Sequence, residues 1–299
     1  MSPDLALVSD PSQTPGAWEV ERTREVPGGE VIYREAPAGW LTRDGIPRVR
    51  PYREYVWTPS GERGVRLPSV SRICDCICPK DGVPHWSEER GIEGALLAFK
   101  AGMLTETSRA EHAIAVVREQ GLGARAATKR AADRGLDVHA VNEDYMLTGE
   151  PPKLLDHPEE HRGYLRSWVK AILKLKPEPV AIEQLVVNPD DGYAGRLDMR
   201  AIIGGLLETD EFKTQANGAI YPHAHWGVNL YERAAVQSGA EPASHRRVIV
   251  LPASGDWNLE QHSAIADHED WRVDAGLAWF RANRPVESAC ASRNRAVRG

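Results

Sequence analysis

The sequence predicts an α/β fold, a mixed central sheet flanked by helices, with a helical insertion and an N-terminal β extension. Short strand-like runs separated by Gly and Pro fill residues 18–68. Residues 83–177 are predominantly helical in pattern, and strand patterns return after Pro177. A chain of 299 residues with 41% hydrophobic content is long enough to bury one such core and to carry additions.

These shifts in pattern divide the chain into five segments. We expect a disordered leader at 1–17, a β-rich N-terminal extension at 18–68, a helical section at 69–177, the α/β core at 178–285 and a loose tail at 286–299. Within the core, strand patterns cover 180–187 and 247–251, and helical patterns begin at Tyr221-Pro222 and cover about 268–281.

Bulk composition excludes several classes of protein. The net charge of −6 argues against a chain coated with positive charge, so any contact with nucleic acid must use a local basic groove. No apolar run approaches the ~20 residues that a membrane-spanning helix needs, and the N-terminus lacks the regions of a signal peptide. We therefore expect a cytoplasmic protein without a membrane partner. The four cysteines do not form a secreted disulfide pattern.

Aromatic residues are concentrated in the N-terminal extension. They are Tyr33, Trp40, Tyr52, Tyr55 and Trp57, and they lie near Arg48, Arg50 and Arg53. Such a mixture could stack nucleic-acid bases. Aromatic residues are also common in strands for packing alone, and packing is the simpler interpretation.

The cysteines cluster where the helical section begins. Ser69 is placed to cap a helix that ends before Pro79 and carries Cys74, Cys76 and Cys78. On a helix Cys76 points away from the other two, so buried thiols are the default interpretation. A four-thiolate metal site that includes Cys290 is the alternative, as in a structural zinc protein.

Two predicted helices carry a basic stripe. The first stripe is Arg125, Lys129, Arg130 and Arg134, and the second is Arg166, Lys170 and Lys174. Each could follow a phosphate backbone, although charged helix faces often meet only water. Because both precede the acidic hairpin described next, we expect them to form a DNA-binding groove.

The centre of the sequence pattern is a predicted hairpin around Gly204-Gly205, since both glycines can take positive φ. Counting outwards from that turn sets Asp198 opposite Glu211 and places Lys213 on the same face as Glu211. Opposed carboxylates are only ~4.5–5.5 Å apart at Cβ and destabilise a sheet unless a positive charge lies between them. The pattern therefore predicts a divalent cation, with two solvated acids on an edge strand as the alternative.

Two further residues are candidates. His139 follows Gly135 by one helical turn, so the glycine would leave space over the imidazole. Glu183 is an acid within the buried strand pattern at 180–187. A structural histidine and a solvated glutamate are the alternatives.

Together these pieces resemble the PD-(D/E)XK nuclease superfamily, in particular the RecB-like phage exonucleases related to CRISPR adaptation nucleases. The resemblance spans about residues 69–283 and runs in the order of that branch: Gly135 to His139, Glu183, Gly195 to Asp198, Glu211 to Thr214, and an element ending at Tyr231. It implies a restriction-endonuclease-like core and metal-dependent hydrolysis of DNA. Two positions depart from the pattern: Glu211 stands where Asp is more usual, and Gly227 where glutamine is usual.

The resemblance implies roles for individual residues. The catalytic residues would be Asp198, Glu211, Lys213 and Glu183; the metal ligands would be His139, Asp198, Glu211 and the carbonyl of Phe212; and the DNA contacts would be the two basic stripes and Tyr231. Oxygen ligands suit Mg²⁺, and a histidine nitrogen makes Mn²⁺ suitable as well. The adaptation nucleases often hold an iron–sulfur cluster with one early cysteine and three late ones. This chain has three early cysteines and one late cysteine, so no iron–sulfur cluster is expected.

The expected function is therefore that of a DNA exonuclease. The alternative is a DNA-binding or regulatory protein that keeps the fold without cutting, because the usual glutamine is missing. A homo-oligomer or a recombination partner protein is left open.

Overall fold

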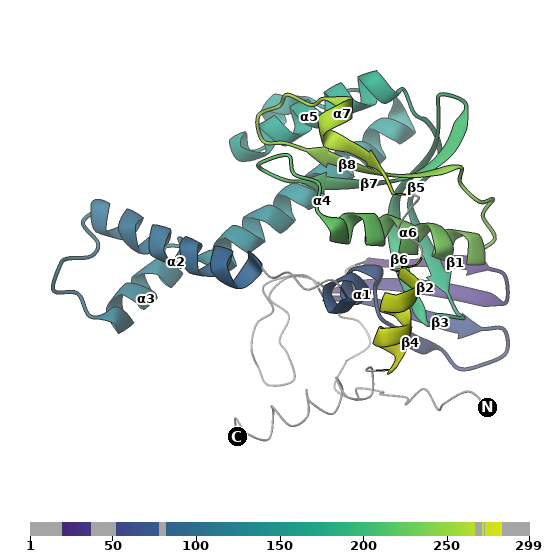
Figure 1. The fold of residues 1–299 in the computed structure, drawn as a ribbon, viewed down its shortest axis with the longest axis horizontal. Coiled ribbons are helices and arrows are strands. Elements are labelled where there is room, and N and C mark those ends of the chain that lie inside the picture. Colours follow the sequence, from purple (N-terminus) through teal and green to yellow (C-terminus); the bar gives the residue numbers. More distant parts are fainter. Residues whose placement is uncertain (1–19, 37–51, 78–81, 267–270, 272, 283–299) are drawn as a thin grey trace. The chain divides into compact units, whose positions relative to one another are not determined.

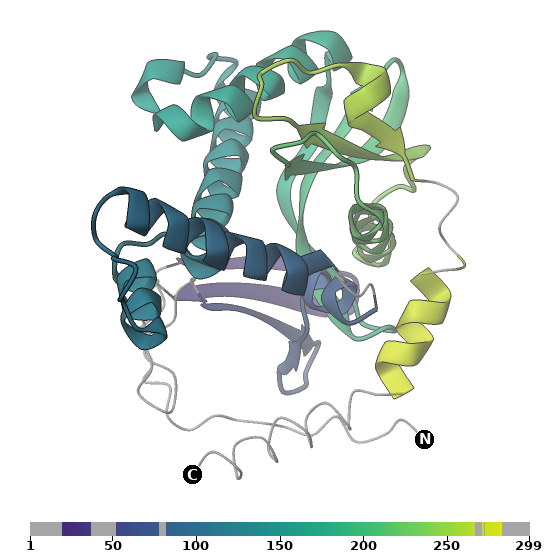
Figure 2. The ribbon, with the colours of Figure 1, turned by 60° about the vertical axis from the view of Figure 1, so that its left-hand side comes forward.

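The computed structural model describes residues 20–36, 52–77, 82–266, 271 and 273–282 (Figures 1 and 2). These residues form a mixed α/β structure with two sheets and several helices, which confirms the predicted α/β class. The chain divides into two compact units. The main unit comprises residues 1–78 and 141–299, and the helical unit comprises residues 79–140.

The first sheet of the main unit has four antiparallel strands in sequence order. They are β1 (Val20–Val26), β2 (Gly29–Ala36), β3 (Tyr52–Pro59) and β4 (Val65–Leu67). Tyr33, Tyr55 and Trp57 are buried in a cluster that also takes in Leu185 and Val187 of the second sheet. These three aromatic residues therefore pack rather than offer a base-stacking surface. Trp40, Arg48 and Arg50 lie outside the described residues.

The second sheet has five strands and is mixed, as predicted. Its order is β5 (Glu178–Asn188), β6 (Tyr193–Ile203), β7 (Leu206–Thr214), β8 (His245–Leu251) and β9 (Ser263–Ile265). Neighbours are antiparallel except β7 and β8, which are parallel. Gly204 and Gly205 both have positive φ, and Ile203 pairs with Leu206, so the predicted turn and its register are confirmed.

Two helices cover opposite faces of this sheet, α5 (Glu159–Leu175) and α6 (Pro222–Gln237) (Figures 1 and 2). Val248 and Val250 of β8 pack with Ala224 and Val228 of α6. On the other face, the Ser167 hydroxyl of α5 donates a hydrogen bond to the carbonyl of Pro252, 2.8 Å away. Side chains of β7 that lie in register with the two valines therefore project toward α6.

Helix α1 (Val70–Ile77) packs against the α6 side of the main unit. The backbone N–H of Arg72 donates to the Ser69 hydroxyl at 3.1 Å, which confirms the predicted cap. Cys74 is a buried cysteine outside any disulfide, and it packs in the core with Ile73, Tyr193 and Leu230. Residues 273–282 form a further helix, whose buried face joins the same core. Cys78 and Cys290 lie outside the described residues.

The helical unit contains α2 (Gly82–Lys100), α3 (Ala110–Glu119) and the first part of α4 (Ala124–Thr148). The boundary with the main unit falls inside α4, between Ala140 and Val141. Two short elements complete the described structure, the 3₁₀ turn η1 (Leu154–Asp156) and α7 (Leu259–His262). Among the described helices, none has the length and apolar character required to cross a membrane.

Candidate metal centre

Three acids lie in a row across neighbouring strands of the five-stranded sheet. Met199 on β6 pairs with Asp210 on β7, so the register sets the next residue outward, Asp198, opposite Glu211. On its other side, the pairings of Ile182 with Met199 and of Gln184 with Leu197 set Glu183 opposite Asp198. All three carboxylates are buried, with residue exposures of only 4–5%. Such a row requires positive charge nearby.

The backbone at Glu183 departs from the extended conformation. Its φ is 46°, in the left-handed region that non-glycine residues rarely adopt. The β5–β6 pairing omits Glu183 and Asp198 while continuing on either side of them. Strained residues of this kind cluster at functional sites, where the surrounding structure holds them in place. The irregular backbone therefore lies at one of the three acids of the row, Glu183.

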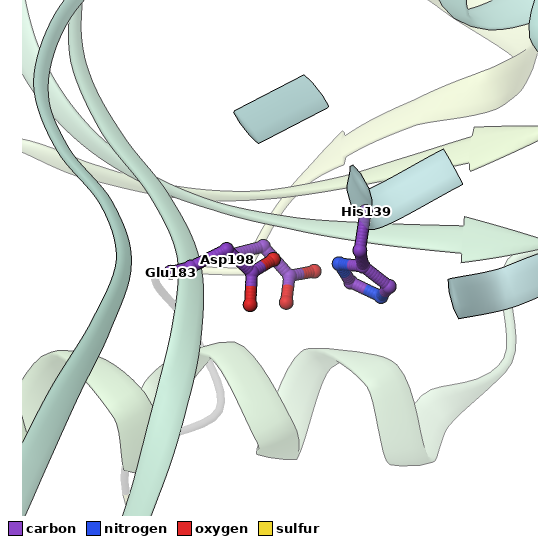
Figure 3. Close-up of side chains that lie close together, drawn as sticks. All are labelled: His139, Glu183 and Asp198. Atoms are coloured by element: carbon purple, nitrogen blue, oxygen red, sulfur yellow. The ribbon is translucent and has the colours of Figure 1, made fainter. Parts of the chain in front are cut away.

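A half-buried histidine and two buried carboxylates could together hold a metal ion. They are His139, Glu183 and Asp198, whose ligand atoms all lie within 4.8 Å of one another. Figure 3 shows the two carboxylates side by side with the imidazole facing them. His139 lies on α4, two residues before Val141, where the main unit resumes. Two carboxylates and an imidazole are a donor set that suits Mg²⁺ or Mn²⁺.

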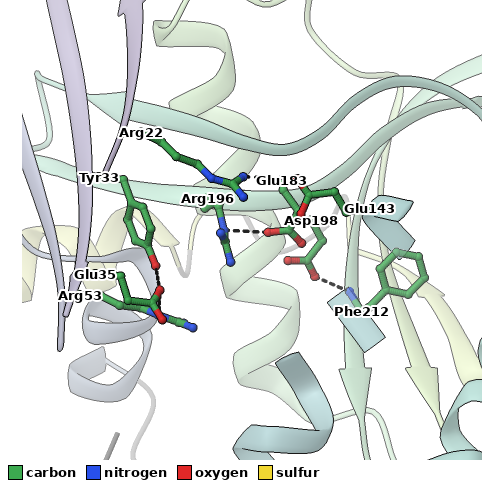
Figure 4. Close-up of polar contacts among 9 residues, drawn as sticks. All are labelled: Arg22, Tyr33, Glu35, Arg53, Glu143, Glu183, Arg196, Asp198 and Phe212. Atoms are coloured by element: carbon green, nitrogen blue, oxygen red, sulfur yellow. Dashed lines mark hydrogen bonds and ion pairs between the residues drawn. The ribbon is translucent and has the colours of Figure 1, made fainter. Parts of the chain in front are cut away.

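This group differs from the predicted ligand set. The predicted ligands are His139, Asp198, Glu211 and the carbonyl of Phe212, with Glu183 among the catalytic residues only, whereas the structure groups Glu183 directly with His139 and Asp198. The backbone N–H of Phe212 donates to the Asp198 carboxylate at 2.7 Å (Figure 4). Phe212 thus orients the central acid through its N–H, a contact that does not test the ligand role predicted for its carbonyl.

Glu211 and Lys213 form an ion pair on β7, the neighbouring strand. They lie in register with Val248 and Val250, so both project toward α6. Burial disfavours the charged lysine, but Glu211 and Asp198 outweigh that effect and raise the pKa of Lys213 above its ordinary value. Lys213 is therefore positively charged at neutral pH and lies beside the acids. Glu211 and Lys213 share one face of β7, as the sequence predicted.

The opposite face of β7 carries a different charged group. Glu208 accepts two hydrogen bonds from the Arg247 guanidinium, at 2.6 and 2.9 Å. Asp210 is 1% exposed, and burial raises its pKa well above the ordinary value, with the charge of Glu208 adding to the shift. On this face of β7 the acids are compensated by Arg247, whereas on the face toward α6 Glu211 is compensated by Lys213.

The basic stripes lie in different units. Arg166, Lys170 and Lys174 are exposed on α5 while Leu165 and Trp168 are buried, so the predicted amphipathic pattern is confirmed. However, α5 covers the face of the sheet opposite α6, and the structure does not bring this stripe beside Glu211 and Lys213. The stripe Arg125, Lys129, Arg130 and Arg134 belongs to the helical unit; three of its members are exposed and Arg134 is half-buried.

Tyr231 packs in the core instead of lying on a surface. It is 9% exposed, and an added Cβ at Gly195 would lie 2.5 Å from its ring carbon Cε1. Burial raises the pKa of Tyr231 well above its ordinary value, and Glu211 and Asp198 add to that shift. Gly195 is therefore a glycine because the tyrosine ring needs its space, and a DNA contact by this side chain is not supported. At Gly135, by contrast, an added Cβ would meet no described atom within 4 Å, so the expected steric role near His139 is absent.

The sequence did not indicate Arg196 as a site residue, and it indicated Tyr33 only for base stacking or packing. The Arg196 Nε atom lies 2.7 Å from a carboxylate oxygen of Glu183, and the guanidinium carbon lies 5.3 Å from the centre of the Tyr33 ring. The only available signal was a basic residue within the predicted strand, two positions before Asp198.

No protein-family model and no curated protein matches the chain.

Proposed function

We propose that the chain is a metal-dependent deoxyribonuclease that hydrolyses phosphodiester bonds, with exonuclease action as the form implied by its resemblance to the RecB-like branch of the PD-(D/E)XK superfamily. The observation that carries the proposal is the grouping of His139 with the buried carboxylates of Glu183 and Asp198, with Glu211 and Lys213 on the adjacent strand. DNA is the proposed partner and Mg²⁺ or Mn²⁺ the proposed cofactor.

Each residue has a role that follows from its surroundings. Asp198, Glu183 and His139 would hold the cation, and Phe212 fixes the central carboxylate through its backbone N–H. When bound, the cation would polarise the phosphate and acidify the attacking water. Lys213 remains charged beside Glu211, so it would orient the water or offset charge on the phosphoryl oxygens. Glu211 in turn keeps the lysine ammonium within the row of acids.

The direct test is the Lys213→Ala variant assayed with end-labelled linear DNA and Mg²⁺ or Mn²⁺. Loss of the ammonium should reduce the rate of hydrolysis by about 10²–10³-fold. Lys174→Ala is the matched control, since Lys174 is exposed on the far face of the sheet and should leave the rate unchanged. Undiminished digestion by Lys213→Ala would exclude this site, and a parallel assay with circular DNA separates exonuclease from endonuclease action.

A non-cleaving DNA-binding protein is the second candidate, and Gly227 is the observation that favours it. An added Cβ there would meet only the Cys74 sulfur, at 3.9 Å, so no steric conflict explains why the usual glutamine is missing. Binding of DNA without metal-dependent cleavage above a metal-free control would favour this candidate.

A further inference from the structure

The guanidinium of Arg196 lies between the candidate metal centre and the N-terminal sheet (Figure 4). Its Nε atom is 2.7 Å from Oε2 of Glu183, and the side chains of the pair are 18% and 3% exposed. The pair holds the carboxylate strongly, because Glu183 is almost completely shielded from water and breaking the pair would leave its charge buried without compensation. One oxygen of Glu183 is thus committed to Arg196.

Arg196 is itself held by the N-terminal sheet. The guanidinium carbon is 5.3 Å from the centre of the Tyr33 ring, within the range of a cation–π contact. The Tyr33 hydroxyl donates to Glu35, whose carboxylate also lies 3.1 Å from Nε of Arg53. Tyr33 is 1% exposed, so its ring is a fixed surface rather than a mobile one. A continuous set of contacts therefore runs from β2 to Glu183.

Positioning matters at Glu183 for a specific reason. Its φ of 46° means that its own backbone does not hold the side chain in an ordinary strand direction. Glu183 must nevertheless keep an oxygen within 4.8 Å of the ligand atoms of Asp198 and His139. Partners that orient metal ligands commonly change metal affinity by about 10–100-fold when they are altered.

We infer that Arg196 is a positioning residue that holds Glu183 for cation binding, and that the ring of Tyr33 holds Arg196, so the N-terminal sheet is a functional part of the metal centre. This inference rests on the proposed metal site. It assigns the N-terminal sheet a role in metal affinity beyond that of a structural extension.

Charge-conserving variants test the inference, because removing the positive charge would by itself attract a cation. Arg196→Lys retains the charge but loses the planar fork and its stacking geometry. Tyr33→Leu removes the aromatic face, whereas Tyr33→Phe retains it. Mn²⁺ binding is measured by titration calorimetry on the full chain, and thermal unfolding identifies any variant that does not fold.

We expect Arg196→Lys to weaken Mn²⁺ binding by about 10-fold. Tyr33→Leu should weaken it in the same direction, and the double variant should be no weaker than Arg196→Lys alone, since both changes interrupt one set of contacts. Tyr33→Phe should bind like the wild type. Arg34→Lys is the matched control: Arg34 neighbours Tyr33 on β2 and pairs with Glu21 at 2.7 Å, in an exposed pair away from Glu183.

The outcomes separate the two proposals. Wild-type affinity in Arg196→Lys overturns the inference even if Tyr33→Leu fails to fold, and full additivity of the two changes overturns the link to the sheet. If the wild type binds Mn²⁺ without cleaving DNA, the proposed nuclease activity fails while the calorimetric comparison still decides the inference. If the wild type binds no Mn²⁺, both are overturned.

Discussion

Two clusters of buried charge share strands β6 and β7, and they are satisfied in different ways. The first, the clamp cluster, consists of Arg200, Thr209 and Glu232. Glu232 accepts hydrogen bonds from the Thr209 hydroxyl at 2.6 Å and from the backbone N–H of Ala243 at 2.7 Å, and Arg200 lies 3.5 Å away. The second is the site row of Glu183, Asp198 and Glu211. Here Glu183 pairs with Arg196 and Glu211 pairs with Lys213, while Asp198 accepts a hydrogen bond from the backbone N–H of Phe212.

The two clusters differ in how far the burial of their carboxylates is compensated. In the clamp cluster one carboxylate meets one guanidinium and two further donors, so burial is compensated. The site row instead sets three carboxylates on neighbouring strands, at positions where opposed carboxylates repel. Under the proposed function, a bound cation would offset that repulsion. The predictions below alter each cluster in turn.

The largest expected effect is on the clamp cluster. Glu232→Ala removes two hydrogen bonds and leaves Arg200, which is 2% exposed, without its carboxylate. The free energy of unfolding should fall by about 3–5 kcal/mol, measured by urea denaturation. Glu232→Gln keeps the shape and one acceptor oxygen, so it should cost less. Equal losses in the two variants would show that the charge and hydrogen bonds of Glu232 are not what holds α6 to the hairpin.

Asp198→Asn should have the opposite effect, a large loss of hydrolysis with little change in stability. The amide oxygen can still accept the hydrogen bond from Phe212, but the central negative charge of the site row is lost. Metal-dependent hydrolysis should fall by at least about 100-fold. Stability should stay the same or rise by up to about 1 kcal/mol, because like charges across a sheet repel. A loss of stability as large as that of Glu232→Ala would make Asp198 a structural residue.

The sequence predicted the part of this comparison that depends on local geometry. Two adjacent glycines fix the hairpin turn, and period-two alternation then aligns Asp198, Glu211 and Lys213 without further information. Neither the strain at Glu183 nor its pairing with Arg196 follows from alternation, because an irregular residue breaks the period that such counting assumes. The contact of Arg196 with Tyr33 joins two sheets through a packing arrangement that has no local sequence pattern. The α5 stripe was predicted as a helix face correctly, but its side of the sheet depends on topology.

Two glycines, Gly195 and Gly135, differ in how much space surrounds them, and alanine substitutions test that difference. Gly195→Ala places a Cβ 2.5 Å from the Tyr231 ring and 3.1 Å from Cγ2 of Val70, so stability should fall by about 1–3 kcal/mol. Gly135→Ala is the matched control, because its Cβ meets no described atom within 4 Å and it lies inside helix α4. There alanine should raise stability by about 0.5–1 kcal/mol. Thermal and urea unfolding distinguish the two signs.

The smallest effects concern the two basic stripes, one on α5 in the main unit and one on α4 in the helical unit. The double variant Arg125→Gln/Lys129→Gln on α4 should lower DNA affinity and reduce the slope of log affinity against log salt by about 1.8, if each residue meets one phosphate. Arg166→Gln/Lys174→Gln on α5 should leave both quantities unchanged, because α5 lies on the face of the sheet opposite the one toward which Lys213 projects. Fluorescence anisotropy with a labelled duplex at several salt concentrations measures both. An equal change in the two variants would mean that DNA also meets the face of the sheet that α5 covers, so the site row would not define the face on which the substrate lies.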